Sequence, residues 1–387
     1  MGVRHLSEIN FIQDDFSFAE DVTIIIFGYS RLGMRLCDEL ISQAKRNVYF
    51  CDNSVNKIGQ IYRNVLVLSV EHSVRVAAKK AYFICSLFHE NSMKKQLLDL
   101  GVASETIFSA PTILIEEEKL EMQREKGCCK EKFQFEVDIA MHCNLKCKSC
   151  HHFSPLAEKE VTDFHVFRND FERLANLFGE DVDRIYLLGG EPLLNSDISI
   201  YLGTARKSFL NATIELITNG ILLSKMSAFF WNCCKENRIK ISVTKYPIKM
   251  DYLEIEAMCK AKGVEFEFFG SAVNDKHMSY YPLDTEGNQN VKENFYSCNM
   301  ANKCITLKNG ILYPCVLPAN IIHFNRYFGK SLNVSEKDGV NIYEAKSKDE
   351  ILDFLSKPIP FCRYCNVKRR TYDNRWEQSR LEIEEWT

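Results

Sequence analysis

Three cysteines, Cys143, Cys147 and Cys150, stand close together with the spacing C-x3-C-x2-C. They follow residues 133–139, which alternate between apolar and polar side chains as strands do. We therefore expect the cysteines on a loop at a strand end, where barrels of alternating strands and helices carry their active sites. Three thiolates at this spacing can hold three irons of one 4Fe–4S cube and leave the fourth iron open to a small chelating ligand.

A second motif follows about forty residues later, where residues 187–194 read Leu-Leu-Gly-Gly-Glu-Pro-Leu-Leu. The two motifs, in this order and at this separation, resemble the signatures of the radical S-adenosylmethionine (SAM) enzymes. The resemblance covers about residues 130–370. It implies a catalytic 4Fe–4S cluster on the three cysteines, SAM as a cofactor, and a one-electron reductant such as flavodoxin or ferredoxin as a partner.

The cysteine triplet has two alternative interpretations. A structural zinc site would need a fourth ligand, which His151 or His152 could supply, but it leaves the Gly-Gly-Glu-Pro segment unexplained. A disulfide framework is disfavoured because the chain shows no apolar secretory signal at its start. Sixteen cysteines in such a chain indicate a reducing, cytoplasmic location and metal binding.

Composition excludes several classes of function. A net charge of −3 over 49 basic and 52 acidic residues leaves no basic surface for nucleic acid. No apolar run approaches the roughly 18 residues of a membrane span. At 387 residues, the chain is long enough for two or three domains.

The first block, residues 1–115, is predicted to be a small Rossmann-like α/β domain. Residues 22–27, 48–51, 65–68 and 81–87 read as buried strands, and residues 34–44 as a helix. Gly28 and Gly33 would allow the tight turn after the first strand, and Asp52 lies where a ribose-binding acid is expected. The middle position of the glycine motif is Ser30, whose side chain would crowd a pyrophosphate.

Redox use of a dinucleotide is therefore disfavoured. The block loosely resembles the nucleotide-sugar-binding domains of bacterial surface-polysaccharide proteins. A docking or scaffolding domain, in which the glycines serve only the turn, remains the alternative. The charged residues 116–126 are interpreted as a solvated helix or linker, and the adjacent Cys128 and Cys129 as ordinary thiols.

The second block, residues 130–290, alternates strands with helices, as a parallel sheet requires. Strands are predicted at 133–139, 184–188, 213–218, 240–244 and 264–269, and helices at 164–178 and 198–208. The block is short for eight strand–helix units. It resembles the six-unit partial (β/α)6 barrel of radical SAM enzymes.

The resemblance assigns SAM contacts to residues at the strand ends. It implies that Gly189, Gly190 and Glu191 bind the methionine amine, with the glycines allowing a close backbone approach. Thr218, Asn219 and Gly220 resemble the position that contacts ribose and carboxylate. Ser242, Thr244 and Lys245 are weaker candidates, for which ordinary strand-end polar residues are the alternative.

The chain departs from the family pattern before the third cysteine. An aromatic residue that packs on adenine is common there, whereas this chain has Ser149. Phe153 or neighbouring backbone could take over the contact, or the contact could be absent. His151 and His152 are candidates for acid–base roles, although histidines beside a cluster more often pack or orient ligands. The catalytic acid or base is left unassigned.

The third block, residues 291–387, holds a second cysteine pattern. Asn309 and Gly310 predict a two-residue turn inside a hairpin at 305–314, which would bring cysteines near its ends. The pattern resembles the twitch extension of radical SAM proteins, the shorter relative of the SPASM extension. It implies one auxiliary 4Fe–4S cluster, with ligands at Cys298, Cys315, Cys362 and Cys365.

Cys304 is a fifth candidate for these four places. Its short distance to Gly310 in sequence favours Cys298 instead. A zinc site built from the same four thiolates is the alternative, because such a ligand set suits zinc equally. The remaining cysteines on apolar runs are interpreted as buried hydrophobes: Cys37, Cys51, Cys85, Cys233, Cys234 and Cys259.

The predicted function is that of a radical SAM enzyme, which cleaves SAM to a 5′-deoxyadenosyl radical and removes hydrogen from a substrate. The first block favours a sugar or nucleotide-activated sugar of polysaccharide biosynthesis as substrate, with dehydrogenation or epimerisation as the reaction. Maturation of a peptide is the alternative substrate class. A metal-binding protein without catalysis is the alternative from outside the enzymes.

Overall fold

The computed structural model describes residues 21–44, 47–87, 89–123, 133–269 and 277–387. The chain forms two compact units, Met1–Met122 and Gln123–Thr387. Cys128 and Cys129 lie outside the described residues. No helix among the described residues combines the length and apolar character that crossing a membrane requires.

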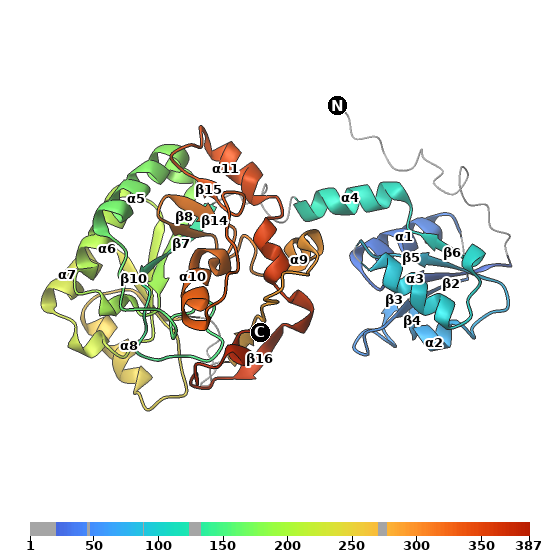
Figure 1. Ribbon diagram of the computed structural model, residues 1–387, viewed down its shortest axis with the longest axis horizontal. Helices are drawn as coiled ribbons and strands as arrows, with labels where there is room; N and C mark the ends of the chain where they lie inside the picture. The colour runs from blue at the N-terminus through green and yellow to red at the C-terminus, as the bar shows by residue number, and fades with distance from the viewer. Residues whose placement is uncertain (1–20, 45–46, 88, 124–132, 270–276) are drawn as a thin grey trace. The chain divides into compact units, whose positions relative to one another are not determined.

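The first unit is a doubly wound sheet in the strand order β3-β4-β2-β1-β5-β6, which confirms the predicted Rossmann-like domain (Figure 1). All pairings are parallel except that of β3 with β4. Its elements are β1 Thr23–Phe27, α1 Arg31–Ser42, β2 Val48–Asp52, β3 Ile61–Tyr62, β4 Val65–Ser69, α2 Val70–Ser73, β5 Lys80–Ile84, α3 Glu90–Asp99, β6 Ile107–Ser109 and α4 Thr112–Gln123.

Helix α4 contains most of the charged stretch that was interpreted as a solvated helix or linker. The helix is confirmed, but one of its charges is not solvated. Glu118 is buried and accepts a hydrogen bond from Arg31 Nε at 2.8 Å, and Glu121 pairs with Arg35. These ion pairs join α4 to α1, so α4 belongs to the first unit.

The second unit is built on one sheet in the order β11-β10-β9-β8-β7-β13-β14-β15. Strands β7 to β11 are parallel neighbours, as expected of a partial barrel, and the predicted strands and helices are confirmed within two residues at their ends. The barrel elements are β7 Phe133–Ala140, α5 Phe164–Phe178, β8 Val182–Gly189, α6 Ile198–Ser208, β9 Thr213–Thr218, α7 Ala228–Glu236, β10 Ile239–Val243, α8 Tyr252–Ala261 and β11 Phe266–Phe268.

The third block adds its strands to the same sheet. Strand β13 joins β7 in parallel, and β13, β14 and β15 continue antiparallel. The further elements are β12 His277–Tyr280, α9 Val291–Ser297, β13 Thr306–Lys308, β14 Ile311–Tyr313, α10 Val316–Phe328, β15 Val340–Asn341, α11 Lys348–Leu355 and β16 Thr371–Arg375, which pairs with β12. Because the blocks share a sheet, the boundary at residues 290/291 stays a prediction.

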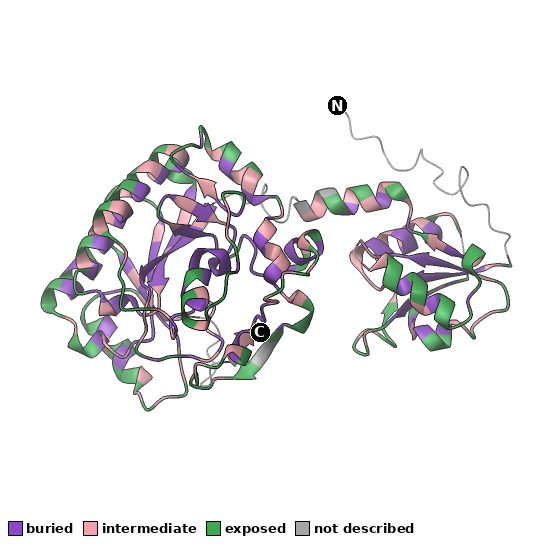
Figure 2. Cartoon of the chain, viewed as in Figure 1, coloured by how far each residue is buried: buried purple, intermediate pink, exposed green. Residues whose placement is uncertain are grey.

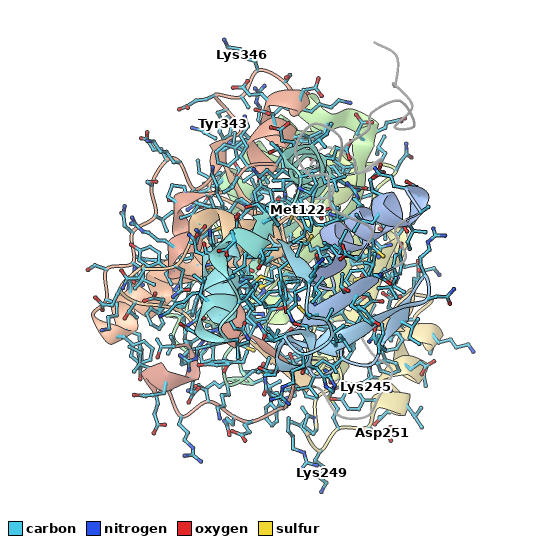
Figure 3. The ribbon with its side chains drawn as sticks, turned by 90° about the vertical axis from the view of Figure 1, so that its right-hand side faces the viewer. Met122, Lys245, Lys249, Asp251, Tyr343 and Lys346 are labelled. Carbon is cyan, nitrogen blue, oxygen red and sulfur yellow. The ribbon has the colours of Figure 1, made fainter. Side chains whose placement is uncertain are left out.

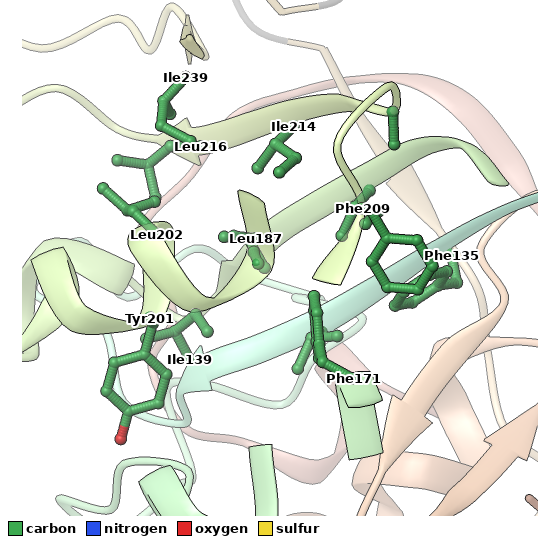
Figure 4. Packing of buried hydrophobic residues seen from close by; sticks show 14 of the residues in the cluster. Phe135, Ile139, Phe171, Leu187, Tyr201, Leu202, Phe209, Ile214, Leu216 and Ile239 are labelled. Atoms are coloured by element: carbon green, nitrogen blue, oxygen red, sulfur yellow. The ribbon is translucent and has the colours of Figure 1, made fainter. Parts of the chain in front are cut away.

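The barrel core lies between the sheet and the helices α5, α6 and α7 on its outer side (Figure 1). Figure 4 shows Phe135 of β7 beside Phe171 of α5 and Phe209, with Leu187 and Leu216 of the next strands close by. Buried hydrophobic residues of the second unit form this cluster and a separate one around the C-terminal cysteines. Figure 2 shows the buried parts of the chain in purple along the central strands. Alternate residues of β7 face the other way, which directs Glu136 and Asp138 into the barrel.

Candidate active site

The cysteine triplet lies on the loop after β7, as the sequence predicts. Cys143, Cys147 and Cys150 all line one cavity of about 270 Å³. Residues at the carboxyl ends of the next three strands line the same cavity: Gly189, Gly190, Thr218, Asn219, Thr244 and Tyr246. In the part of the chain that the structure describes, no three His, Cys, Asp or Glu side chains are gathered closely enough to hold a single metal ion as they stand.

The loop owes its shape to three residues with left-handed backbone, Lys146, Ser149 and Phe153, whose φ angles lie between 51° and 56°. Ser149 is buried, and its hydroxyl donates to the carbonyl of Glu385 at 2.6 Å. Phe153 is 1% exposed and packs against Phe324 and Trp386. Neither side chain lines the cavity, so an aromatic contact with adenine would have to come from elsewhere.

The two glycines of the Gly-Gly-Glu-Pro segment hold the end of β8 against the cysteine loop. A Cβ atom on Gly190 would lie 2.1 Å from the carbonyl oxygen of His142, and one on Gly189 would lie 2.4 Å from that of Ala140. The amide of Gly190 donates to the Ala140 carbonyl at 2.7 Å. The close approach that requires glycine is therefore to the chain's own backbone.

Glu191 is fully buried and lies behind the cavity wall. Its carboxylate accepts hydrogen bonds from Thr218 Oγ1 at 2.7 Å and from the amides of Asn219 at 2.9 Å and Leu193 at 3.1 Å. Burial raises the pKa of Glu191 to about 7, and these three donors oppose that rise. The carboxylate joins the ends of β8 and β9, and its oxygens are engaged with protein donors.

Asn219 brings a polar side chain to the first cysteine. Its Nδ2 donates to Asn144 Oδ1 at 2.8 Å and lies 3.8 Å from Cys143 Sγ. Burial raises the pKa of Cys143 to about 12, so this thiol needs the positive charge of bound iron to become a ligating thiolate. Three thiols, a wall of strand-end backbone and this amide fit a 4Fe–4S cluster with a chelating ligand.

The weaker candidates on β10 separate into two groups. Thr244 lines the cavity, whereas Ser242 is buried and donates to Glu215 Oε2 at 3.0 Å. Lys245 lies on the loop that also carries Lys249 (Figure 3), and its Nζ lies 3.8 Å from the centre of the Phe268 ring. Tyr246 also lines the cavity with the cysteines, although no sequence pattern indicated it.

The two histidines after the triplet both line the cavity. His152 Nδ1 lies 2.8 Å from Asp138 Oδ1 on β7. Burial would lower the pKa of His152, but the charge and hydrogen bond of Asp138 raise it to about 10. His151 Nε2 lies 3.0 Å from the carbonyl oxygen of Ser279, and its ring meets Tyr281 edge-on at 4.2 Å. Because Asp138 keeps the pKa of His152 high, it is His152 that presents a cation to the cavity.

The segment 377–386 also contacts the cysteine loop, which no sequence pattern indicated. The amide of Lys148 donates to the Glu377 carbonyl at 3.0 Å, and that of Ser379 donates to the Lys146 carbonyl at 2.9 Å. The indole Nε1 of Trp386 donates to the Cys150 carbonyl at 3.0 Å. Such long-range backbone pairing leaves no local periodicity by which to predict it.

Comparison with known proteins finds local matches. A GTP 3′,8-cyclase of Helicobacter pylori is 32% identical over 93 residues, which are 24% of this chain and 28% of the relative. A GTP 3′,8-cyclase of Aliarcobacter butzleri is 26% identical over 91 residues, 24% of this chain and 28% of the relative. The chain thus spans less than a third of the length of these curated relatives. No family model matches the chain.

Among solved structures, BtrN in complex with AdoMet and 2-DOIA overlays with a TM-score of 0.40 at 18% identity, over 61% of this chain and 94% of that one. The structure of anSMEcpe with bound AdoMet overlays with a TM-score of 0.39 at 16% identity, over 66% of this chain and 93% of that one. At these scores the overlays add nothing to the topology described above. The sequence matches and the meeting of the two motifs in one cavity agree with the resemblance to radical SAM enzymes.

The C-terminal cysteines form a second group. Cys298, Cys315 and Cys365 belong to one buried cluster of side chains, and the partly buried Cys362 packs against it. The hairpin turn at Asn309 and Gly310 is confirmed. Asn294 fixes the turn between the last two cysteines by donating to both of their carbonyls. Cys304 lies outside this cluster.

One cation is buried among these thiols. Arg370 Nη1 donates to Cys298 Sγ at 3.0 Å. Burial would raise the pKa of Cys298, but the charge and hydrogen bond of Arg370 bring it below its ordinary value. By contrast, burial raises the pKa of Cys365 to about 12. The four thiols fit an auxiliary cluster, and Cys298 is the one that a buried cation contacts.

The Rossmann-like unit has a cavity of its own, of about 440 Å³, at the carboxyl ends of β1, β2 and β5. The strand order reverses beside β1, which is where doubly wound sheets bind ligands. Lys57, Ser86, His89 and Gln96 line the cavity with Gly28, Ser30 and Asp52. Asp52 accepts bonds from the Tyr29 amide at 2.8 Å, the Ser54 amide at 2.9 Å and Lys57 Nζ at 3.1 Å.

The glycines of this unit have a structural reason. Gly28 has φ +117°, and a Cβ there would lie 2.7 Å from the Cys85 carbonyl; a Cβ on Gly33 would lie 2.2 Å from the Gly28 carbonyl. Ser30 caps α1, since its hydroxyl accepts from the Gly33 amide at 3.2 Å. The turn alone thus accounts for Gly28, Ser30 and Gly33, and the cavity beside them is where a ligand would bind.

Proposed function

We propose that this protein is a radical SAM enzyme that binds one 4Fe–4S cluster on Cys143, Cys147 and Cys150, binds SAM beside it, and removes a hydrogen atom from a carbohydrate. The observation that carries the proposal is the single cavity shared by the cysteine triplet and the three strand ends. When bound, the cluster and SAM supply a 5′-deoxyadenosyl radical. The chain's own residues bind and orient both and keep water away.

Several residues have defined parts in this proposal. Asn219 places its amide between the cysteine loop and the cavity, and Thr244 offers a hydroxyl from the next strand. Glu191 holds the ends of β8 and β9 together from behind. His152, charged and fixed by Asp138, presents a donor to a substrate oxygen at the cavity wall.

An alcohol that has lost a hydrogen atom becomes a carbonyl by losing one further electron and one proton. The cysteine group of Cys298, Cys315, Cys362 and Cys365 would hold the electron acceptor as an auxiliary 4Fe–4S cluster. Epimerisation would instead return a hydrogen atom to the opposite face of the same carbon. A flavodoxin or ferredoxin would supply the electron that starts either reaction, in the cytoplasm.

The Rossmann-like unit supports a nucleotide-activated sugar as the substrate class. Its cavity offers the cation of Lys57 and the hydroxyls of Ser86 and Ser92, groups that suit a phosphate. Because Gly28 is fixed by its backbone contacts, a bulky change there would report only on folding. The test therefore uses Lys57.

Two measurements test the proposal. Anaerobically reconstituted protein should produce 5′-deoxyadenosine from SAM under reduction, and absence of this product with a fully loaded cluster would refute the enzyme assignment. In calorimetry on the full chain, nucleoside-diphosphate sugars should bind, and Lys57→Gln should weaken binding at least several-fold, while the exposed Lys95→Gln should not. Binding of no nucleotide sugar, with hydrogen loss from an added peptide, would favour peptide maturation.

A further inference from the structure

Arg370 stands out because a guanidinium is buried where apolar packing and thiols surround it. The residue is 9% exposed, follows the Cys362–Cys365 turn closely in sequence, and lies in the interior that contains the C-terminal cysteines. A buried cation is costly unless negative charge compensates it. Its surroundings therefore indicate which negative charge it is placed to meet.

The contacts of Arg370 point at the cysteine group. Nη1 donates to Cys298 Sγ at 3.0 Å and lies 3.4 Å from Asn299 Oδ1. The guanidinium lies 4.6 Å from the centre of the Tyr281 ring. Among the described residues, the buried Nε has no hydrogen-bond partner. One donor thus contacts a thiol directly, and another, Nε, is buried without a protein acceptor among the described residues.

An auxiliary cluster on these thiolates would supply the missing charge. A 4Fe–4S cube with four thiolate ligands is a net anion, and reduction adds one further negative charge. A fixed cation and a hydrogen bond to a ligand sulfur stabilise the reduced form more than the oxidised one, so both raise the reduction potential. The direction of the effect follows from charge alone.

The same side chain connects the cysteine group with the catalytic cavity. Arg370 stacks on Tyr281, the Tyr281 ring meets His151 at 4.2 Å, and His151 lines the cavity of the cysteine triplet. A cluster on Cys298 would therefore lie at the end of a packed row of side chains that begins where the substrate would react. An electron acceptor at this place benefits from a raised potential.

We propose that Arg370 is a positioning residue for the auxiliary cluster. Arg370 holds Cys298 in place as a ligand and raises the reduction potential of the cluster, so that the cluster accepts an electron from the substrate side. This inference rests on the proposed function, because it requires the auxiliary cluster to exist. It assigns a role to a residue outside both cysteine motifs.

The test measures the potential of the auxiliary cluster alone. The variant Cys143→Ala, Cys147→Ala, Cys150→Ala removes the ligands of the other cluster, and Arg370→Gln and Arg370→Lys are made in that background. Arg369→Gln is the matched control, since Arg369 is its exposed neighbour. Iron content is determined first, and the midpoint potential is then followed by electron paramagnetic resonance during reductive titration.

The expected result is a lower midpoint potential in Arg370→Gln, a smaller shift in Arg370→Lys, and no shift in Arg369→Gln. An unchanged potential in Arg370→Gln with full iron content would overturn the inference while leaving the proposed function intact. Loss of iron in both Arg370 variants, with Arg369→Gln normal, would show that Arg370 is needed only for cluster assembly. That result would also overturn the proposal that Arg370 raises the cluster's reduction potential. Absence of iron in the triple variant itself would instead refute the auxiliary cluster.

Discussion

Thr218 Oγ1 donates a 2.7 Å hydrogen bond to Glu191 Oε1, and this bond joins the ends of the second and third barrel strands behind the catalytic cavity. The Glu191 carboxylate also accepts from the Asn219 and Leu193 amides. Two segments that sequence comparison treats as separate SAM contacts are thus one hydrogen-bonded unit.

The hydrogen bonds to Glu191 predict that stability falls further in a variant that removes more of them. Thr218→Val should cost about 1–3 kcal/mol of stability, because it leaves a buried carboxylate short of one donor. Glu191→Ala should cost more, because three donors then lose their acceptor. Both variants should weaken SAM binding while iron content stays near normal, as measured by equilibrium dialysis and iron analysis on the same preparations. Full SAM affinity in Glu191→Ala would show that the unit has no part in the SAM site.

The iron count separates the two cysteine groups. Wild-type protein should hold about eight irons per chain after reconstitution, and the triple alanine variant of Cys143, Cys147 and Cys150 about four, given four irons in each cube. That variant should form no 5′-deoxyadenosine. Cys298→Ala should then lose or convert the remaining cluster, whereas Cys304→Ala should leave its spectrum unchanged. Zinc in place of iron at the C-terminal group would contradict the assignment.

Gly190 tests whether the glycine segment serves the protein backbone. Gly190→Ala places a methyl group 2.1 Å from the His142 carbonyl, and the required shift should cost about 3 kcal/mol and lower cluster occupancy. Gly203→Ala is the matched control, since nothing lies within 4 Å of its added Cβ in helix α6. The control should keep or gain stability, by up to about 1 kcal/mol. Equal effects in thermal unfolding would contradict the steric argument.

His323 of α10 predicts a pH dependence of stability. It is 2% exposed, neither ring nitrogen has a hydrogen-bond partner within the described residues, and burial with the nearby Lys308 charge lowers its pKa to about 4. The folded protein therefore binds fewer protons there than the unfolded chain, whose histidine pKa is about 6.5. The stability that depends on a neutral His323 is therefore fully present above pH 6.5. It is lost as the pH falls toward 4, which lowers the free energy of unfolding by an amount on the order of 3 kcal/mol.

The variant His323→Leu should flatten this acid limb when denaturant unfolding is repeated between pH 4 and 7.5. His165→Leu is the control, since His165 is an exposed residue on the outer helix α5. An unchanged acid limb in His323→Leu would assign the pH dependence to other groups.

Local sequence patterns predicted the elements well because strands and helices leave periodic signals. Residues 164–178 and 213–218 were predicted with the bounds that the structure has, and the turn at Asn309 and Gly310 follows from their left-handed backbone. The reason for Gly189 and Gly190 could not be predicted, because it depends on the course of another loop.

Contacts between distant segments escaped prediction for the same reason. Arg370 and Trp386 belong to no motif, and their partners Cys298 and Cys150 lie far from them in sequence. Glu191 was recognised as part of a motif, but its burial behind the cavity depends on the packing of β8 against β9. Spacing predicts which residues act together, whereas tertiary packing decides what each one touches.

Trp386 provides the last prediction, because it braces the cysteine loop in two separable ways. Its Nε1 donates to the Cys150 carbonyl at 3.0 Å, and its ring packs on Phe153 and Phe328. Trp386→Phe keeps a ring but removes the donor and should cost about 1 kcal/mol. Trp386→Ala should cost about 3–5 kcal/mol, since it also opens a cavity.

The loop carries the ligands of the proposed catalytic cluster, so its geometry should change with these contacts. Trp386→Ala should lower iron occupancy at the triplet several-fold and alter the change that SAM causes in the electron paramagnetic resonance signal of that cluster. Trp231→Phe is the control, because Trp231 is equally buried but lies on the barrel helix α7. It should lose stability without changing that signal. If Trp386→Ala destabilises the protein yet leaves occupancy and signal as in the wild type, segment 377–386 stabilises the fold and does not shape the cluster site.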